Sequence, residues 1–436
     1  MKRYRKKSFL LCSVFLFSLY LAGCSFFGVS ERNTESGEEM ESSRGGDFGT
    51  EMLESSGEEV SETETLELSA AASLNPEKTE EEILQKKAAE YLDEMTIEEK
   101  AAQLFIVLPE SLMEGAGSVT AAGTAAQEAI NQIPVGGFIY MQNNLQSSEQ
   151  VTSMLANVQK FSRERIGLPM FLCVDEEGGS VARIAGTGKF DVPGIESMAE
   201  IGLRQNADEA YEIGTTIGGY LSDLGFNVDF APVADVLTNP ENQVVKKRAF
   251  GSDAGVVSYM ADAAAEGLMS QGILPCLKHF PGHGNTTADT HAGYAYSNKT
   301  KEELYECELI PFLKGIEHDV PFIMIGHISL PNVIGDDTPA SLSSVIMQDL
   351  LREEMGYEGI IITDAFNMGA IVNQYSSAEA AVKALQAGAD ILLMPKDFSS
   401  AYEEVVSAMK DGRLPVERID ESLMRIFRRK IELDSR

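Results

Sequence analysis

Three of the five histidines of the chain lie in one stretch, residues 278–291 (KHFPGHGNTTADTH). The stretch follows an apolar run, Ile273–Leu277, so the pattern predicts a buried strand that ends in a flexible loop rich in proton-transfer groups. Asp289 lies two residues before His291, close enough to fix the tautomer of the imidazole and raise its basicity. A histidine oriented by an aspartate suits proton transfer to and from a substrate, and a solvated salt bridge is the alternative.

The spacing of two of these histidines is also that of metal ligands. His279 and His283 are four residues apart, and together with Asp289 and His291 they offer a set of zinc ligands. Ligands at this spacing share one face of a helix, but the Pro-Gly pair between them breaks any helix. Metal binding is therefore the weaker interpretation, and the sequence predicts neither a bound metal nor a cofactor.

Two carboxylate positions elsewhere also follow apolar runs. Asp364 comes directly after Gly359–Ile362 and one threonine, where an unpartnered charge is costly. The position suits a nucleophile or a ligand for a cationic centre, and a helix N-cap is an equal alternative. Upstream, Asp175, Glu176 and Arg183 flank a Gly-Gly pair, a combination typical of sites that bind sugar hydroxyls, although an ordinary turn would contain it too.

Eight continuous apolar runs alternate with segments long enough to hold a helix. One such segment has an apolar face at a spacing of three and four residues between Val151 and Val158, and Thr96 with Glu99 has the pattern of a capping box. The eight runs are Leu104–Leu108, Gly136–Met141, Pro169–Val174, Val228–Val233, Leu274–Leu277, Val320–Ile325, Gly359–Ile362 and Ala389–Met394. Such runs predict a parallel sheet that is covered on both faces.

Eight parallel strands are also the number that closes a barrel, so we predict an α/β fold, a (β/α)8 TIM barrel. An open doubly wound sheet is the alternative, but no phosphate-binding glycine turn follows the first run. In a barrel the chemistry lies just past the carboxyl ends of the strands. Polar side chains follow five of the runs: Asp175 and Glu176, Asp235, Lys278 and His279, His327, and Asp364.

The first 75 residues predict export and tethering rather than a fold. Basic residues at 2–7 precede an apolar core over 8–22 that ends in Leu-Ala-Gly-Cys24, which predicts a lipoprotein signal peptide over 1–23 and lipid on Cys24. An uncleaved anchor and an ordinary secretory signal are the alternatives. Residues 25–75 contain thirteen acidic and two basic residues, a net charge of −11, so 24–75 is expected to be a disordered linker before a catalytic domain over 76–436.

The formal net charge of −33 argues against nucleic acid and anionic membrane surfaces as partners. In so acidic a chain Arg248 is most simply a surface charge. Cys173, Cys276 and Cys307 are expected to be buried small hydrophobes rather than a disulfide or metal set. We expect a monomer that contacts the membrane through its lipid alone.

Five blocks together resemble glycoside hydrolase family 3. They are DEEGG (175–179), FAPVADV (230–236), RAFG (248–251), KHFPGHG (278–284) and TDAFNMGA (363–370), and the resemblance runs from about Met95 to Met394. The Asp289-Thr290-His291 loop is similar to that of the β-N-acetylglucosaminidase branch, whose acid/base catalyst is a histidine paired with an aspartate. β-Glucosidases of the family take an acid/base glutamate from a second C-terminal domain, for which this sequence leaves no room.

The resemblance implies a role for each matching residue. Asp364 would be the nucleophile of a retaining mechanism, and His291, oriented by Asp289, the acid/base. Glu176 stands where glutamine is common and Phe366 where methionine or leucine is common, which affects substrate detail only. Five positions would bind the terminal sugar: Asp175, Arg183, Arg248, Lys278 and His279.

The sequence thus predicts an exo-acting β-N-acetylglucosaminidase, anchored outside the membrane, that trims GlcNAc from peptidoglycan-derived glycans. Within the family, a phosphorylase and a β-glucosidase are the alternatives. The phosphorylase is considered because a neutral histidine acid/base would not repel an incoming phosphate. A sugar-binding lipoprotein without catalysis is the alternative from another class.

Overall fold

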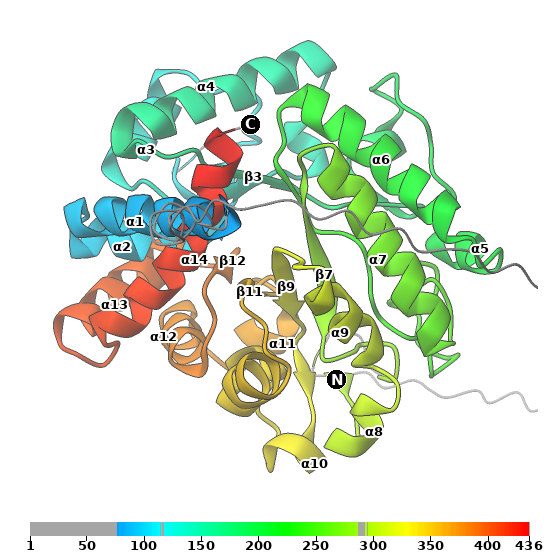
Figure 1. Cartoon of the computed structure of the whole chain (residues 1–436). Coiled ribbons are helices and arrows are strands. Elements are labelled where there is room, and N and C mark those ends of the chain that lie inside the picture. Colours follow the sequence, from blue (N-terminus) through cyan, green and yellow to red (C-terminus); the bar gives the residue numbers. More distant parts are fainter. Residues whose placement is uncertain (1–75, 114, 116, 287–292, 294, 436) are drawn as a thin grey trace, which may run out of the picture. The chain divides into compact units, whose positions relative to one another are not determined.

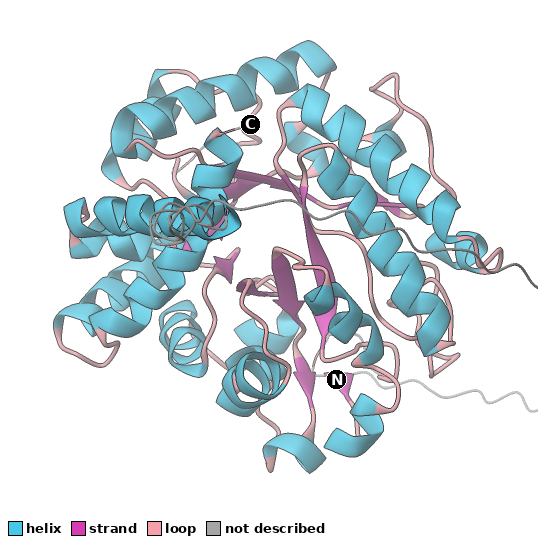
Figure 2. Cartoon of the chain, viewed as in Figure 1, coloured by secondary structure: helices cyan, strands magenta, loops and turns pink. Residues whose placement is uncertain are grey.

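Eight short parallel strands form the centre of the structure, and Figure 2 shows them surrounded by helices. The computed structural model describes residues 76–113, 115, 117–286, 293 and 295–435. The strands lie in the order β11-β9-β7-β6-β3-β2-β1-β12. Their bounds are β1 (Phe105–Val107), β2 (Gly137–Ile139), β3 (Phe171–Val174), β6 (Val228–Asp229), β7 (Leu274–Phe280), β9 (Phe322–Ile325), β11 (Ile360–Thr363) and β12 (Leu392–Leu393).

The two edges of this sheet meet, so the sheet is a nearly closed barrel. A parallel bridge joins Ile362, in β11, to Ile391, directly before β12. The Thr363 N–H donates to the Ile391 carbonyl at 3.1 Å. Each predicted apolar run overlaps one of the eight strands, and β7 and β11 extend beyond their runs. The open doubly wound alternative is wrong because β11 and β12 are in contact.

A helix or a group of helices follows each strand and returns the chain to the other end of the barrel (Figure 1). The α-helices are α1 (Pro76–Glu94), α2 (Ile97–Gln103), α3 (Thr124–Gln132), α4 (Ser148–Ile166), α5 (Met198–Gly202), α6 (Ala207–Leu224), α7 (Ala254–Ser270), α8 (Lys301–Tyr305), α9 (Ile310–Glu317), α10 (Pro331–Ile334), α11 (Gly369–Val372), α12 (Ser377–Ala387), α13 (Phe398–Lys410) and α14 (Val416–Asp434). A π-helix at Val345–Glu354 precedes β11. Short 3-10 turns lie at Pro109–Ser111, Gln142–Asn144, Ala185–Thr187 and Ala340–Leu342.

Local sequence signals account for two of these helices. Thr96 caps α2 in the predicted capping box, because its side chain accepts from the Glu99 N–H and the Glu99 carboxylate accepts from the Thr96 N–H. In α4 the predicted apolar face, which includes Val151 and Val158, is buried against the barrel. Both predictions are confirmed.

Two pairs of very short strands lie outside the barrel. β4 (Glu176–Gly178) and β5 (Val181–Ala182) form an antiparallel hairpin after β3. β8 (Ala295–Tyr296) and β10 (Ile328–Ser329) pair in parallel. Both pairs lie in the segments that follow the barrel strands β3, β7 and β9.

The amino ends of the strands are closed by α14 and by the end of α2. Lys430, in α14, is fully buried, and its Nζ donates to Gln103 Oε1 at 2.7 Å. The ammonium group lies 5.1 Å from the centre of the Phe171 ring at the start of β3. This end of the barrel is therefore filled with side chains.

The predictions for the first 75 residues stay predictions, because the signal peptide, the lipidated Cys24 and the acidic linker fall outside the described residues. Within the described ranges, no helix combines the length and apolar character needed to span a bilayer. Cys173 and Cys276 are buried free thiols, as predicted, whereas Cys307 is only partly buried.

Candidate active site

A cavity of about 480 Å³ opens at the carboxyl ends of the barrel strands. Six of the eight residues predicted to act on the sugar line it: Asp175, Arg183, Arg248, Lys278, His279 and Asp364. The wall also includes Glu177, His283, Asn367 and a set of methionines at 141, 324, 368 and 394. The remaining two predicted residues, Asp289 and His291, lie outside the described residues.

Strand β7 carries two of these residues and is longer than predicted. The apolar run ends at Leu277, but the strand continues to Phe280, so Lys278 and His279 belong to the strand and not to a loop. The pairing of β7 with β9 shifts register between Lys278 and Phe280. Successive side chains of a regular strand face opposite sides, so this irregularity lets both Lys278 and His279 reach the cavity.

Lys278 is held between two carboxylates. Its Nζ lies 2.9 Å from Asp175 Oδ1 and 2.6 Å from Glu177 Oε1, and the residue is 2% exposed. Burial alone would lower the pKa of Lys278, but Asp175 and Glu177 raise it above its ordinary value. The lysine is therefore a fixed cation in the cavity wall.

Glu177 also binds Arg248 through both of its oxygens. Arg248 Nε lies 2.7 Å from Oε2, and Nη2 lies 2.7 Å from Oε1. Burial opposes ionisation of Glu177, but Arg248 and Lys278 hold its pKa far below the usual range. Interpreting Arg248 as a surface charge is therefore wrong, because its guanidinium is paired in the cavity wall.

Glu176 does not belong to the site, although the sequence suggested both Asp175 and Glu176 as carboxylates at the strand end. Its carboxylate turns away from the cavity and accepts from the Ile184 and Ala185 N–H groups at 2.7 and 2.9 Å and from the Tyr220 hydroxyl at 2.9 Å. It anchors the loop that follows Arg183, and the missed carboxylate is Glu177.

Asp235 is a second residue that the sequence did not assign to a role. It is fully buried, and its Oδ2 lies 2.7 Å from His279 Nδ1. Its Oδ1 accepts from the backbone N–H groups of His279 and His283 at 3.2 and 2.6 Å. Asp235 therefore fixes the His279 ring and the turn after β7, and leaves His279 Nε2 at 3.4 Å from Arg248 Nη2.

Asp364 stands at the carboxyl end of β11, half-buried and open to the cavity. Its Oδ1 accepts from the Ala365 N–H at 2.7 Å, and the next helix, α11, begins only at Gly369 with Met368 as its N-cap. The N-cap alternative is therefore wrong. Burial raises the pKa of Asp364, but His327, His279, the Ala365 N–H and Lys278 together lower it below its ordinary value.

His327, which follows β9, supports Asp364 from behind. Its Nδ1 lies 2.7 Å from Ser341 Oγ, and its Nε2 lies 3.1 Å from the Ala365 carbonyl. The ring thus holds the residue whose N–H binds the Asp364 carboxylate. This arrangement orients one oxygen of Asp364.

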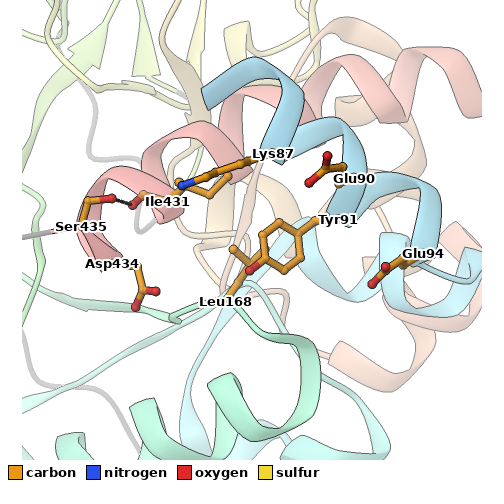
Figure 3. Close-up of a pocket in the computed structure, with 8 residues that line it drawn as sticks. All are labelled: Lys87, Glu90, Tyr91, Glu94, Leu168, Ile431, Asp434 and Ser435. Carbon is orange, nitrogen blue, oxygen red and sulfur yellow. Dashed lines mark hydrogen bonds between the residues drawn. The ribbon is translucent and has the colours of Figure 1, made fainter. Parts of the chain in front are cut away.

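A second cavity, of about 420 Å³, lies between α1 and α14 (Figure 3). Its four charged lining residues are exposed at the surface: Lys87, Glu90, Glu94 and Asp434. The Ser435 hydroxyl donates to the Ile431 carbonyl of the same helix at 2.9 Å. Its charges do not converge as those around Lys278 do, so the site lies at the carboxyl ends of the strands.

A barrel with paired charges and an ionised carboxylate at the carboxyl ends of its strands is typical of barrel enzymes. The family model described as "Glycosyl hydrolase family 3 N terminal domain" matches residues 96–429. The chain therefore belongs to glycoside hydrolase family 3, as its sequence blocks suggested.

Several proteins similar to this chain are named as hexosaminidases or N-acetylglucosaminidases. The chain is 33% identical to "Beta-hexosaminidase A" of Pseudoalteromonas piscicida, over 70% of this chain and 55% of that protein. It is 35% identical to "Beta-hexosaminidase LpqI" of Mycobacterium tuberculosis, over 59% of this chain and 67% of that protein. A solved family 3 β-N-acetylglucosaminidase from a Paenibacillus species matches with a TM-score of 0.72 and 33% identity, over 78% of this chain and 63% of that one. The chain thus spans little more than half of the first relative.

Proposed function

We propose that the chain is a retaining exo-β-N-acetylglucosaminidase that removes terminal β-linked GlcNAc from glycans. The observation that carries this proposal is Asp364, an ionised carboxylate that faces the cavity from the carboxyl end of β11. A nucleophile in glycoside hydrolysis must be a carboxylate that stays charged in a partly buried site. The names of the similar proteins support GlcNAc as the sugar.

In the proposed reaction Asp364 attacks the anomeric carbon, and the bond to the leaving oxygen breaks as that oxygen takes a proton from His291. Water, deprotonated by His291, then cleaves the glycosyl ester, so two inversions retain the anomeric configuration. Asp289 orients His291. The roles of both residues rest on the family resemblance, because they lie outside the described residues.

The remaining groups of the cavity wall would hold the sugar. Lys278 and Arg248 are fixed cations that donate hydrogen bonds, and Asp175 and Arg183 face the same space. A cavity of about 480 Å³ lies within the range of small-ligand sites, roughly 300–1,000 Å³. We propose that the cavity holds one terminal sugar and that its leaving group lies outside the cavity.

The biological substrate and the location are part of the same proposal. The pattern over residues 1–24 supports export, lipid attachment at Cys24 and tethering outside the membrane. We propose that the tethered chain is a monomer. We propose peptidoglycan-derived glycans as the substrate, because they contain GlcNAc and lie outside the membrane. A Cys24→Ala variant should leave the membrane fraction, whereas an unchanged distribution would contradict the anchor.

The test of the activity is turnover of aryl glycosides by the full chain. We expect release of p-nitrophenol from the β-GlcNAc glycoside, slower release from the β-glucoside and β-xyloside, and free sugar as the product with or without phosphate. If the chain binds GlcNAc without turning over any glycoside, the result would contradict the enzyme hypothesis and favour a sugar-binding protein. A sugar phosphate that forms only when phosphate is added would replace hydrolysis by phosphorolysis.

A further inference from the structure

His283 lines the cavity but has no role in the reaction described above. The residue is 2% exposed, and its Nδ1 lies 2.8 Å from Thr286 Oγ1. Its other ring nitrogen, Nε2, is buried and has no hydrogen-bond partner among the residues that the structure describes. Buried polar atoms are nearly always paired, so an unpaired one in a cavity wall indicates a missing partner.

The hydrogen bonds around His283 determine what Nε2 can do. Thr286 has one hydroxyl proton, which it donates to the His283 carbonyl at 2.9 Å. We therefore assign the ring proton to Nδ1, from which the same oxygen then accepts, and a lone pair to Nε2. Asn242 Nδ2 contacts both groups as well, since it donates to the His283 carbonyl at 2.9 Å and to Thr286 Oγ1 at 3.2 Å.

The neutral form of the ring is favoured as well. Burial lowers the pKa of His283, and the adjacent His279 acts in the same direction, although Asp235 opposes both. The backbone is fixed too, because the His283 N–H donates to Asp235 Oδ1 at 2.6 Å. Nε2 is thus a positioned hydrogen-bond acceptor.

Besides His283 Nε2, the described cavity wall has acceptors on Asp175, Asp364 and Asn367. Lys278 and Arg248 can only donate, and the Glu177 carboxylate is already bound by both of them. Asp235 has both oxygens bound to His279 and His283. A sugar presents several O–H groups, and GlcNAc adds an amide N–H, so such a ligand needs acceptors in the wall.

We propose that His283 is a further substrate-binding residue, whose Nε2 accepts a hydrogen bond from an O–H or the acetamido N–H of the sugar in the cavity. This inference rests on the proposed function, because it takes GlcNAc as the ligand. His283 would thus join Lys278, Arg248 and Asp364 as a residue that contacts the sugar, and its contact would help to determine specificity. The source of the proton, hydroxyl or acetamido group, is left to the experiment.

Two substitutions at His283 distinguish the contributions of its two ring nitrogens. In His283→Asn the amide reaches the position of Nδ1, so the contact with Thr286 is kept and nothing replaces Nε2. In His283→Gln the longer side chain can bring an amide oxygen to the position of Nε2. His318→Asn is the matched control, because His318 follows α9 on the outside of the barrel and is 37% exposed.

The measurement is kcat/KM of the full chain for p-nitrophenyl β-GlcNAc and for the β-glucoside, with the thermal midpoint of each variant. We expect His283→Asn to lose roughly ten- to a hundredfold in kcat/KM, as for one lost hydrogen bond in a desolvated site, and His283→Gln to regain part of it. A loss confined to the GlcNAc substrate assigns the acetamido N–H as donor, and an equal loss on both assigns a hydroxyl.

Wild-type kcat/KM in His283→Asn on both substrates, with an unchanged thermal midpoint, would overturn the inference. If His283→Asn does not fold, His283→Gln is compared with His283→Phe, whose side chain cannot accept a hydrogen bond. Equal kcat/KM in these two variants would then overturn the inference. Calorimetric titration with GlcNAc keeps the two proposals apart. If the wild-type chain binds GlcNAc more tightly than His283→Asn does but turns over no glycoside, the proposed hydrolase activity is refuted. The proposal that His283 binds the sugar is then kept.

Discussion

Two buried lysines, one at each end of the barrel, have pKa shifts of opposite sign. Lys278, at the carboxyl ends of the strands, contacts Asp175 and Glu177, and these carboxylates raise its pKa despite its burial. Lys430, at the amino ends, donates to the neutral side chain of Gln103, and burial lowers its pKa to about 7. Burial opposes the charge at both ends, so the carboxylates account for the difference.

The comparison shows how one barrel separates function from stability. At the carboxyl ends, paired charges are kept ionised beside a cavity, so they can bind a polar ligand without changing protonation. At the amino ends, the same side chain is sealed among apolar groups and can lose its proton near neutral pH. A substitution at the first end should therefore change activity most, and one at the second end should change stability and its pH dependence.

The largest effect should come from Asp364→Asn. The amide cannot form the glycosyl ester, so kcat for p-nitrophenyl β-GlcNAc should fall on the order of 10³-fold or more. The thermal midpoint should stay near that of the wild type, because the Ala365 N–H can still donate to the amide oxygen. Asp349→Asn, at an exposed position in the π-helix, is the control, and an active Asp364→Asn would remove Asp364 from the mechanism.

Glu177→Gln should weaken both activity and stability. It leaves Arg248 without its carboxylate and Lys278 with Asp175 alone, so we expect kcat/KM to fall roughly ten- to a hundredfold, mainly through KM. The free energy of unfolding should drop by about 3 kcal/mol, as for a broken buried ion pair. Glu403→Gln, an exposed position in α13, should change neither quantity. Wild-type KM in Glu177→Gln would show that the pairing does not position the cations.

Lys430→Met should change stability in a pH-dependent way and leave kcat/KM unchanged. Between pH about 7 and the unfolded pKa of about 10.4, the unfolded chain binds a proton at this lysine that the folded chain does not, so wild-type stability rises with pH in that window. Methionine has no such proton. The stability of Lys430→Met relative to the wild type should therefore be highest at or below about pH 7 and decline towards about pH 10, by a few kcal/mol at most.

Denaturant titrations at several pH values measure this difference. Lys86→Met is the control, since the Lys86 side chain is 79% exposed. The lost hydrogen bond to Gln103 shifts the difference by the same amount at every pH and does not affect its slope. A difference that is constant with pH would show that Lys430 keeps its charge in the folded state.

Glu176→Gln should have the smallest effect. Burial raises the pKa of Glu176, although the Ile184 and Ala185 N–H groups and Tyr220 act against it. A folded carboxyl with a raised pKa binds a proton that the unfolded chain has released, so wild-type stability falls as pH rises through the interval above about 4.3. The variant should therefore gain stability relative to the wild type as pH rises through this interval. Its kcat/KM should stay within about twofold, whereas a large loss would place Glu176 in the site.

The sequence predicted the eight strands because each is a continuous apolar run between turn residues, as at Ile360–Thr363. It missed the last three residues of β7, where the run of apolar side chains stops. Lys278 can be buried there because Asp175, 103 residues away in the chain, and Glu177 neutralise it. Pairing between distant segments leaves no trace in a local pattern.

The same reason explains the misassigned residues of the site. Glu177 could have been found, since residues two apart in an extended segment share a face and Asp175 was already placed in the cavity. Asp235 and His283 could not be assigned by spacing, because their partners are brought together by the fold of the β7 turn. The positions of Asp289 and His291 relative to Asp364 stay a prediction.

Trapping of the covalent intermediate tests the central claim most directly. The full chain, incubated with a slowly hydrolysed activated β-GlcNAc glycoside and quenched in acid, should gain the mass of one GlcNAc residue, carried by the peptide that contains Asp364. Turnover that yields the inverted anomer without any adduct, or an adduct on another residue, would contradict the account.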